Sequence, residues 1–257
     1  MKKALGFLML TSIVLCALFF YKNSSLVSFS SKKQAAVASP LWIETRKSTE
    51  LYHLVLGDSV AKGYGSSQGG YAEMASAELE KQTGKKVVVD NAAVNGLTTD
   101  YLLRMLQTED IQAKLKKADL ITISIGGNNL LRLNPNDGVL KNLQALEREK
   151  DIYKKDLQEI LNLIRKQNPS ALIVLAELYN PLELDDSVSS YANMFLEGWN
   201  KAVRSSAKTH APAVVLPIQK LLPSKETDLF FDKIHPNDKG YKIIADSFAQ
   251  KVLSYEQ

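Results

Sequence analysis

The chain is short of the residues that form disulfides and most metal sites. It has one cysteine, Cys16, and three histidines among 257 residues. One cysteine can form no disulfide within the chain and no thiolate cluster, and the three histidines are scattered without the spacing of metal ligands. We therefore expect no metal site and no cofactor, and we expect packing alone to hold the folded part together.

The chain also lacks a strong charge of either sign outside its N-terminal part. Residues 1–50 hold seven Lys or Arg and two Glu, a net charge of +5, whereas residues 51–257 hold 25 Lys or Arg and 26 Asp or Glu, a net charge of −1. No basic stripe with interleaved aromatic residues occurs, and this argues against a nucleic-acid partner.

The N-terminal residues are typical of a targeting segment. Lys2 and Lys3 precede an uncharged apolar run, residues 4–21, and polar residues follow it. This run is at the short end for a bilayer span and at the long end for a signal-peptide core, and no small-x-small cleavage sequence follows directly. We expect residues 1–22 to be an uncleaved membrane anchor with the domain outside the cytoplasm. The alternative is a cleaved signal peptide and a secreted protein.

A tether and one domain are predicted after this segment. Residues 23–49 are rich in Ser, Lys and Ala and show no convincing periodicity, so we expect a mostly disordered tether. Residues 50–257 are long enough to bury the core of one α/β domain.

Apolar runs alternate with helical patterns along that domain. Strands are predicted at Leu51–Leu56, Val87–Asp90, Leu120–Ser124, Leu172–Ala176 and Val214–Leu216. Helices are predicted at Tyr71–Thr83, Thr98–Lys117, Leu140–Gln167, Tyr191–Lys208 and Asp238–Leu253. Continuous apolar strands separated by helices indicate a parallel sheet covered on both faces. The expected fold is a three-layer α/β/α sandwich with a five-stranded parallel sheet.

Unusual polar and glycine-rich segments follow the predicted strands. They are Gly57–Ser59, Asn91–Gly96, Ile125–Asn129, Glu177–Pro181 and, after a loop, Asp232–His235. Ligands of open parallel sheets bind beyond the carboxyl ends of the strands. A serine after the first strand, with an aspartate three residues before a histidine, supplies a nucleophile, a base and a group that orients the base. We expect these segments to form one site.

These segments resemble the four sequence blocks of the SGNH or GDSL family of serine esterases and lipases. The resemblance covers essentially all of residues 51–257. It implies that Ser59 is the nucleophile and Asp232 and His235 complete the triad. It further implies that the Ser59 N–H, the Gly96 N–H and the Asn128 side-chain amide are the oxyanion donors.

One position departs from the family pattern. Asn129 stands where the family usually has aspartate, and an amide has nearly the shape of a carboxylate but no charge. The orientation of Asn128 is therefore left open by the sequence. So is an alternative of another class, a tethered binding protein with the fold but weak catalysis.

A second serine competes for the nucleophile assignment. Gly65–Ser66–Ser67–Gln68–Gly69 matches the Gly-x-Ser-x-Gly pattern of another hydrolase fold. That pattern requires a strand immediately before it, and none is predicted there. We expect a flexible glycine loop on the rim of the site. Of the remaining histidines, His53 is expected in the core and His210 at a helix end.

Largely apolar residues are candidates for the rim of the site. They are Tyr64, Leu97, Leu130, Leu131, Tyr179, Phe230, Phe231 and Ile234. This set suits an acyl chain better than a polyanion. We expect a small-molecule or lipid ester of a short- to medium-chain acyl group as substrate. A cell-wall or polysaccharide O-deacetylase is the main enzymatic alternative.

Overall fold

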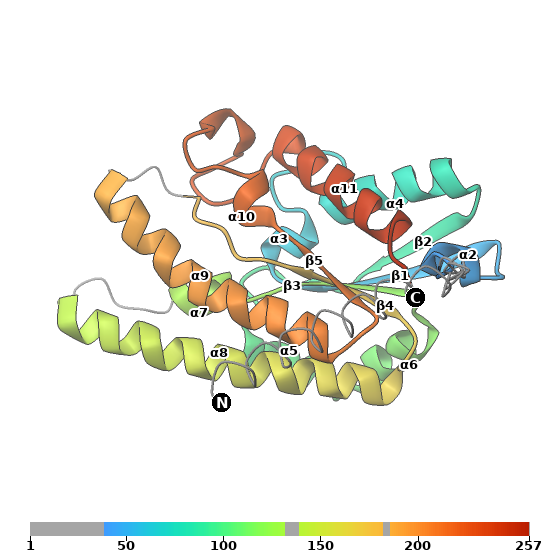
Figure 1. The fold of residues 1–257 in the computed structure, drawn as a ribbon, viewed down its shortest axis with the longest axis horizontal. Helices are drawn as coiled ribbons and strands as arrows, with labels where there is room; N and C mark the ends of the chain where they lie inside the picture. Colours follow the sequence, from blue (N-terminus) through green and yellow to red (C-terminus); the bar gives the residue numbers. More distant parts are fainter. Residues whose placement is uncertain (1–38, 132–138, 182–185, 257) are drawn as a thin grey trace, which may run out of the picture. The chain divides into compact units, whose positions relative to one another are not determined.

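The domain is built on one five-stranded parallel sheet (Figure 1). The structure, a computed structural model, describes residues 39–131, 139–181 and 186–256. The strands are β1 (Glu50–Gly57), β2 (Lys86–Asn91), β3 (Leu120–Ser124), β4 (Leu172–Ala176) and β5 (Ala213–Leu216). Their order is β2-β1-β3-β4-β5, and every neighbouring pair is parallel. All five predicted strands are confirmed, with small shifts at their ends.

Side chains of β1 alternate between the two faces of this sheet. Leu51 and Val55 pack in one core cluster, and Leu54 and Leu56 pack in the other. Successive residues of a strand point to opposite faces, so each face of the sheet supplies one half of the core. The strands β3 and β4 are buried along their whole length, as expected for a sheet covered on both sides.

Two sets of helices cover the two faces, as Figure 1 shows. The first face carries α4 (Gly70–Thr83) and α11 (Asp238–Leu253), whose buried side chains belong to the cluster of Leu51. The second carries α5 (Thr99–Met105), α6 (Glu109–Lys117), α8 (Val139–Gln167) and α9 (Asp186–Thr209). The predicted three-layer α/β/α sandwich is confirmed.

The predicted helix at Thr98–Lys117 is two helices in the structure. Helix α5 ends at Met105, and Thr108 has an extended backbone and donates its hydroxyl proton to the carbonyl of Met105 over 2.8 Å. Thr108 then precedes Glu109 and Asp110, two acidic residues in the first turn of α6, where the helix dipole favours negative charge. The apolar periodicity continues across the break and therefore concealed it.

After the first strand, four short helices occupy described segments in which the sequence showed no helix. They are α3 (Ser59–Lys62), α7 (Gly127–Leu131), α10 (Ile218–Leu221) and the 3-10 turn η1 (Thr227–Leu229). A helix of one turn has too few residues to show periodicity.

The folded domain begins before residue 50, its predicted start. Residues 39–49, part of the predicted disordered tether, include α2 (Trp42–Thr45), and the side chains of Trp42 and Ile43 are buried. The backbone N–H of Trp42 donates to the carbonyl of Tyr255 over 2.7 Å. The Arg46 guanidinium lies 5.0 Å from the centre of the Trp42 ring. The large apolar area of Trp42, together with that of Ile43, fixes this segment to the core, although most residues of the segment are polar.

The predicted membrane anchor, residues 1–22, lies outside the described residues. Within the described ranges, no helix is long and apolar enough to cross a bilayer.

Candidate active site

The first strand ends in a turn that only glycine allows. Gly57 has a φ of +130°, and a Cβ atom there would lie 1.9 Å from the carbonyl oxygen of Ser124. The next residue, Asp58, is buried and accepts a hydrogen bond from the N–H of Val60 over 3.0 Å, which caps α3. Ser59 is therefore the first residue of α3, and its N–H has no partner within the helix.

The structure brings the three predicted triad residues together. The Ser59 Oγ lies 2.8 Å from the Nε2 of His235. The Nδ1 of His235 lies 2.9 Å from Oδ2 and 3.1 Å from Oδ1 of Asp232. All three distances suit hydrogen bonds, so the three side chains form a continuous chain from hydroxyl to carboxylate.

Asp232 is also fixed to the backbone of its own loop. Its Oδ1 accepts the N–H groups of Ile234 and His235, each over 2.7 Å. Partial burial alone would raise the pKa of Asp232, but the hydrogen bonds from His235 and Ile234 outweigh it and hold the pKa below its usual range. The carboxylate is thus charged at neutral pH. The Tyr64 ring contacts the imidazole of His235 edge-on, with ring centres 4.7 Å apart.

The predicted oxyanion donors lie on the neighbouring loops. Gly96 has a φ of +78°, and the side-chain amide of Asn128 donates to the carbonyl of Leu97 over 2.9 Å. This bond links the loop after β2 to the loop after β3. An amide nitrogen carries two N–H groups, so Asn128 retains a second donor. Ser59, Gly96 and Asn128 all line the same cavity.

Asn129 lies away from that cavity. Its side chain is buried, and its hydrogen bonds go to Thr99 at the start of α5. The departure from the family pattern therefore changes a contact behind the site and leaves the cavity wall unchanged.

A cavity of about 640 Å³ opens at Ser59 and His235. Its walls are mostly apolar and include Val60, Leu130, Leu146, Leu178, Pro181, Ala192, Phe195, Leu196, Trp199 and Ile234. Leu146 comes from α8, and Ala192, Phe195, Leu196 and Trp199 come from α9. Two long helices of one layer thus contribute five of the cavity's apolar wall residues, and the segments after the strands contribute the rest.

The rim predicted from the sequence is correct in part. Tyr64, Leu130, Tyr179 and Ile234 line the cavity. Three others do not, since Leu97 is buried in the core, Phe230 packs against the other core cluster, and Phe231 is exposed beside a separate hollow. The side chain of Leu131 lies outside the described residues.

The helical walls of the cavity were missed. Phe195, Leu196 and Trp199 have the spacing of a helix face that packs on the core, and Leu146 belongs to a similar stripe. A core stripe and a cavity wall have the same sequence signature, so only the arrangement of α8 against α9 distinguishes them.

The competing serine has another role. The hydroxyls of Ser66 and Ser67 donate to the two carboxylate oxygens of Asp238 over 2.5 and 2.6 Å, and the N–H of Ser67 also donates to Asp238. The loop is thereby bound to the first residue of α11. No hydrogen bond between Ser67 and a histidine occurs in the described structure.

The other two histidines are satisfied inside the fold. His53 is fully buried in β1, where its ring nitrogens lie 2.8 Å from the Ser76 hydroxyl and 2.6 Å from the Thr122 hydroxyl. Burial lowers the pKa of His53 to about 3, so it is neutral at neutral pH. His210 directly follows α9, and its Nδ1 lies 2.9 Å from the carbonyl of Ser206. His235 alone of the three lies beside a serine and a carboxylate.

Comparisons with known proteins agree with this geometry. Residues 55–243 match the GDSL-like Lipase/Acylhydrolase family. The uncharacterized protein YpmR of Bacillus subtilis is 28% identical over 214 residues, which cover 81% of this chain and 84% of that protein. The spore germination lipase LipC of Bacillus licheniformis is 26% identical over 213 residues, which cover 76% of this chain and 93% of LipC. Among solved structures, the lipase Lip_vut3 from a goat rumen metagenome is 25% identical, with a TM-score of 0.71, over 80% of this chain and 99% of that one.

Proposed function

The chain belongs to the GDSL-like lipase/acylhydrolase family and is a carboxylic ester hydrolase, and from this premise we propose that it cleaves esters of short- to medium-chain acyl groups through Ser59, His235 and Asp232. The observation that carries the proposal is the contact between Ser59 and His235 at an apolar cavity.

The proposed reaction begins with a proton transfer. His235 Nε2 takes the proton of Ser59 Oγ as the oxygen attacks the ester carbonyl carbon. Asp232 accepts the Nδ1–H, which fixes the tautomer of the imidazole, and its charge stabilises the imidazolium that forms. The 2.8 and 2.9 Å distances support both steps without rearrangement of the side chains.

The carbonyl oxygen becomes negatively charged in the tetrahedral intermediate. We assign its stabilisation to the N–H groups of Ser59 and Gly96 and to the second N–H of Asn128. Such donors stabilise a transition state by about 3–4 kcal/mol each because they are already oriented. His235 then protonates the leaving alcohol, and a water molecule activated by the same histidine hydrolyses the acyl-enzyme.

The cavity supports an acyl chain as the group bound beside Ser59. Aliphatic and aromatic side chains dominate its walls, and their burial of an apolar chain yields about 0.8 kcal/mol for each methylene. An acetyl group would leave most of the cavity unfilled. LipC is named a lipase, and that name agrees with a lipid ester as substrate.

A chain-length series tests the proposal. We expect kcat/KM for p-nitrophenyl octanoate to exceed that for the acetate and the palmitate. Ala192→Phe should lower the octanoate value more than the acetate value because Ala192 lines the cavity. Asn193→Phe is the matched control, since the adjacent residue is exposed and lies outside the cavity wall. Turnover of acetylated glycans alone would identify an O-deacetylase and refute the acyl-chain proposal.

We also propose that residues 1–22 hold this domain at a membrane, on the extracytoplasmic side. The support is the sequence alone, with two lysines before an uncharged apolar run. The full chain should remain in the membrane pellet after alkaline extraction, whereas a chain that starts at residue 39 should be soluble. Release of the full chain by alkali would contradict the anchor.

A further inference from the structure

A hydrogen-bond relay, buried at Asn129 and Thr99 and half-buried at Asp156, lies behind the proposed oxyanion donors. The side-chain oxygen of Asn129 accepts the N–H of Thr99 over 3.3 Å, and its amide nitrogen lies 3.1 Å from the Thr99 hydroxyl. The Thr99 hydroxyl lies 2.6 Å from Oδ2 of Asp156. These three residues belong to α7, α5 and α8, so the relay joins three helices.

The direction of every hydrogen bond in this relay is fixed by chemistry. A backbone N–H can only donate, so the atom of Asn129 that faces the Thr99 N–H must be its oxygen. The amide NH2 of Asn129 therefore faces the Thr99 hydroxyl, which must accept from it. The hydroxyl proton is then directed to Asp156, a carboxylate that can only accept.

The relay lies next to both loops that carry oxyanion donors. Asn129 follows Asn128, and Thr99 follows the Gly96–Leu97 segment after one intervening residue. The bond from Asn128 to the Leu97 carbonyl already links these loops on the cavity side. The relay links them a second time on the buried side and connects both to the long helix α8.

We propose that Asp156 is a positioning residue that acts through Thr99 and Asn129 to hold Gly96 and Asn128 at the oxyanion position. This inference rests on the proposed function. Asp156 does not line the cavity. Its effect is to hold the Thr99 hydroxyl as an acceptor toward Asn129, and so to fix the two donor loops relative to each other.

Asn129 and Asp156 thus form a matched pair in this chain. An aspartate at position 129 would accept both the N–H and the hydroxyl proton of Thr99. A buried carboxylate and the half-buried carboxylate of Asp156 would then compete for one hydroxyl proton. Exchange of the two residue types restores the match, because a carboxylate at position 129 would accept from the hydroxyl and an amide at position 156 would donate to it.

An exchange experiment with purified full-length protein and p-nitrophenyl octanoate tests the proposal. Asn129→Asp should lower kcat by about 10- to 100-fold, the range expected for a misplaced group, with KM changed less than about twofold. The double variant Asn129→Asp/Asp156→Asn should recover most of the lost kcat. The matched control combines Asn129→Asp with Asp151→Asn, which removes a negative charge from an exposed position of the same helix and should recover nothing.

Three outcomes would overturn the proposal. They are a wild-type kcat in Asn129→Asp, no recovery in the exchanged double variant, and equal recovery with the Asp151 control. If Asn129→Asp does not fold, Thr99→Val and Thr99→Ser decide instead. The valine should lower kcat without a change in KM, the serine should retain kcat, and equal values for the two would refute the relay.

Failure of the inference is distinguishable from failure of the proposed function. Ser59→Ala and Asn128→Ala test the function alone, since neither alters the relay. If both lose activity and the exchange shows no recovery, only the role of Asp156 is refuted. If both remain active, the assignment of the site is refuted and the inference falls with it.

Discussion

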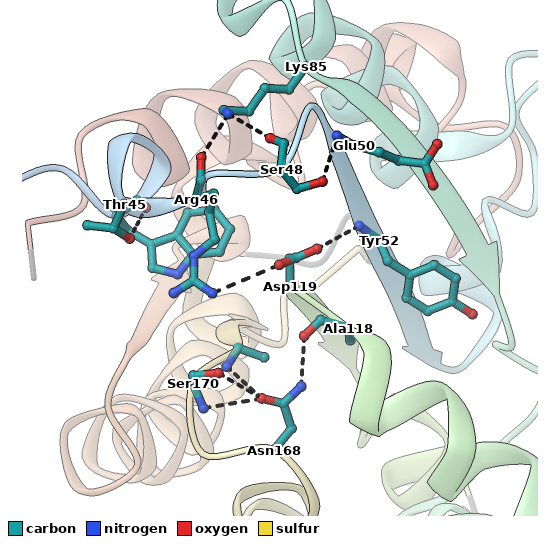
Figure 2. Close-up of polar contacts among 12 residues, drawn as sticks. Thr45, Arg46, Ser48, Glu50, Tyr52, Lys85, Ala118, Asp119, Asn168 and Ser170 are labelled. Atoms are coloured by element: carbon teal, nitrogen blue, oxygen red, sulfur yellow. Dashed lines mark hydrogen bonds and ion pairs between the residues drawn. The ribbon is translucent and has the colours of Figure 1, made fainter.

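The two ends of the parallel sheet use polar side chains in opposite ways. At the carboxyl ends of the strands, Ser59, Gly96, Asn128 and His235 face a cavity and retain donors and acceptors for a ligand. At the amino ends, polar side chains bind the backbone of neighbouring segments, as Figure 2 shows.

The amino end is closed by residues that satisfy backbone groups. Asp119 accepts the N–H of Tyr52 over 3.0 Å and lies 3.9 Å from the Arg46 guanidinium (Figure 2). Lys85 donates to the carbonyls of Arg46 and Ser48, each over 2.8 Å. These bonds hold the segment after α2 against the residues that directly precede β2 and β3.

Asn168 and Arg165 likewise bind backbone groups, in the region where α8 is followed by β4. The amide of Asn168 donates to the carbonyls of Leu115 and Ala118, each over 2.7 Å, and its oxygen accepts the N–H of Ala171. Among the residues that the structure describes, the guanidinium of Arg165 donates to backbone carbonyls alone. Paired polar groups such as those of Asn168 and Arg165 stabilise a fold, whereas a reactive site needs groups whose partners are incomplete. The difference predicts that variants at one end change catalysis and variants at the other change stability.

The largest effect is expected at the carboxyl end. His235→Ala should lower kcat by about 10⁴-fold or more because Ser59 loses its base. The free energy of unfolding should change by less than about 1 kcal/mol, since His235 packs at the rim of a cavity. Steady-state kinetics and urea unfolding measure the two quantities. Lys233→Ala, an exposed change in the same loop, should leave both unchanged. A wild-type kcat in His235→Ala would remove the histidine from the mechanism.

The reverse pattern is expected at the amino end. Asn168→Ala should lower the free energy of unfolding by about 3 kcal/mol because it removes a hydrogen bond from each of two buried carbonyls, Leu115 and Ala118, and from the buried N–H of Ala171. Its kcat should stay within about twofold of the wild type. Gln82→Ala removes an amide from an exposed helix position and should cost little stability. A loss of kcat without a loss of stability in Asn168→Ala would contradict the division between the two ends.

The pH dependence of stability compares two residues of the β1 segment. His53 lies inside the strand, and Asp58 follows its carboxyl end at the active site. Burial lowers the pKa of His53 to about 3, so below its ordinary pKa of 6.5 the unfolded chain binds a proton that the folded chain does not. Stability from His53 is therefore lost as the pH falls from 6.5 toward 3. Burial raises the pKa of Asp58 to about 7 from 3.8, against hydrogen bonds that lower it. Between pH 7 and pH 3.8, Asp58 is protonated in the folded chain and ionised in the unfolded chain. The stability that Asp58 contributes therefore increases as the pH falls from 7 toward 3.8.

These two contributions oppose each other in the wild type. Asp58→Asn removes the contribution of Asp58 and leaves that of His53. Between pH 6.5 and 4.5, the free energy of unfolding should therefore change less favourably in this variant than in the wild type, by about 2 kcal/mol. Urea unfolding at several pH values measures it, with the exposed Asp151→Asn as control. Identical pH profiles for Asp58→Asn and the wild type would refute the account of Asp58.

The sequence predicted the sheet and the residues that surround Ser59 because both depend on local signals. Five apolar runs marked the strands, and the short segments after them placed Ser59, Gly96, Asn128 and the Asp232–His235 pair on one edge. The order of these segments, and the chemistry of a serine with a histidine and an aspartate, pointed to one reaction.

Three features could not be predicted because they depend on contacts between distant segments. The cavity walls on α8 and α9 have the spacing of an ordinary core stripe. Trp42 is buried although it lies in a mostly polar segment, residues 39–49. Asn129 is matched to Asp156 through Thr99, whose bond to Asp156 spans 57 positions. Residues that pack across the fold leave no pattern in their own segment.

Labelling with a fluorophosphonate serine probe tests the central claim most directly, because the probe reacts only with an activated serine. The wild-type chain and Ser67→Ala should be labelled equally, and Ser59→Ala should not be labelled. Labelling that persists in Ser59→Ala and is lost in Ser67→Ala would contradict the account and move the nucleophile to the loop bound by Asp238.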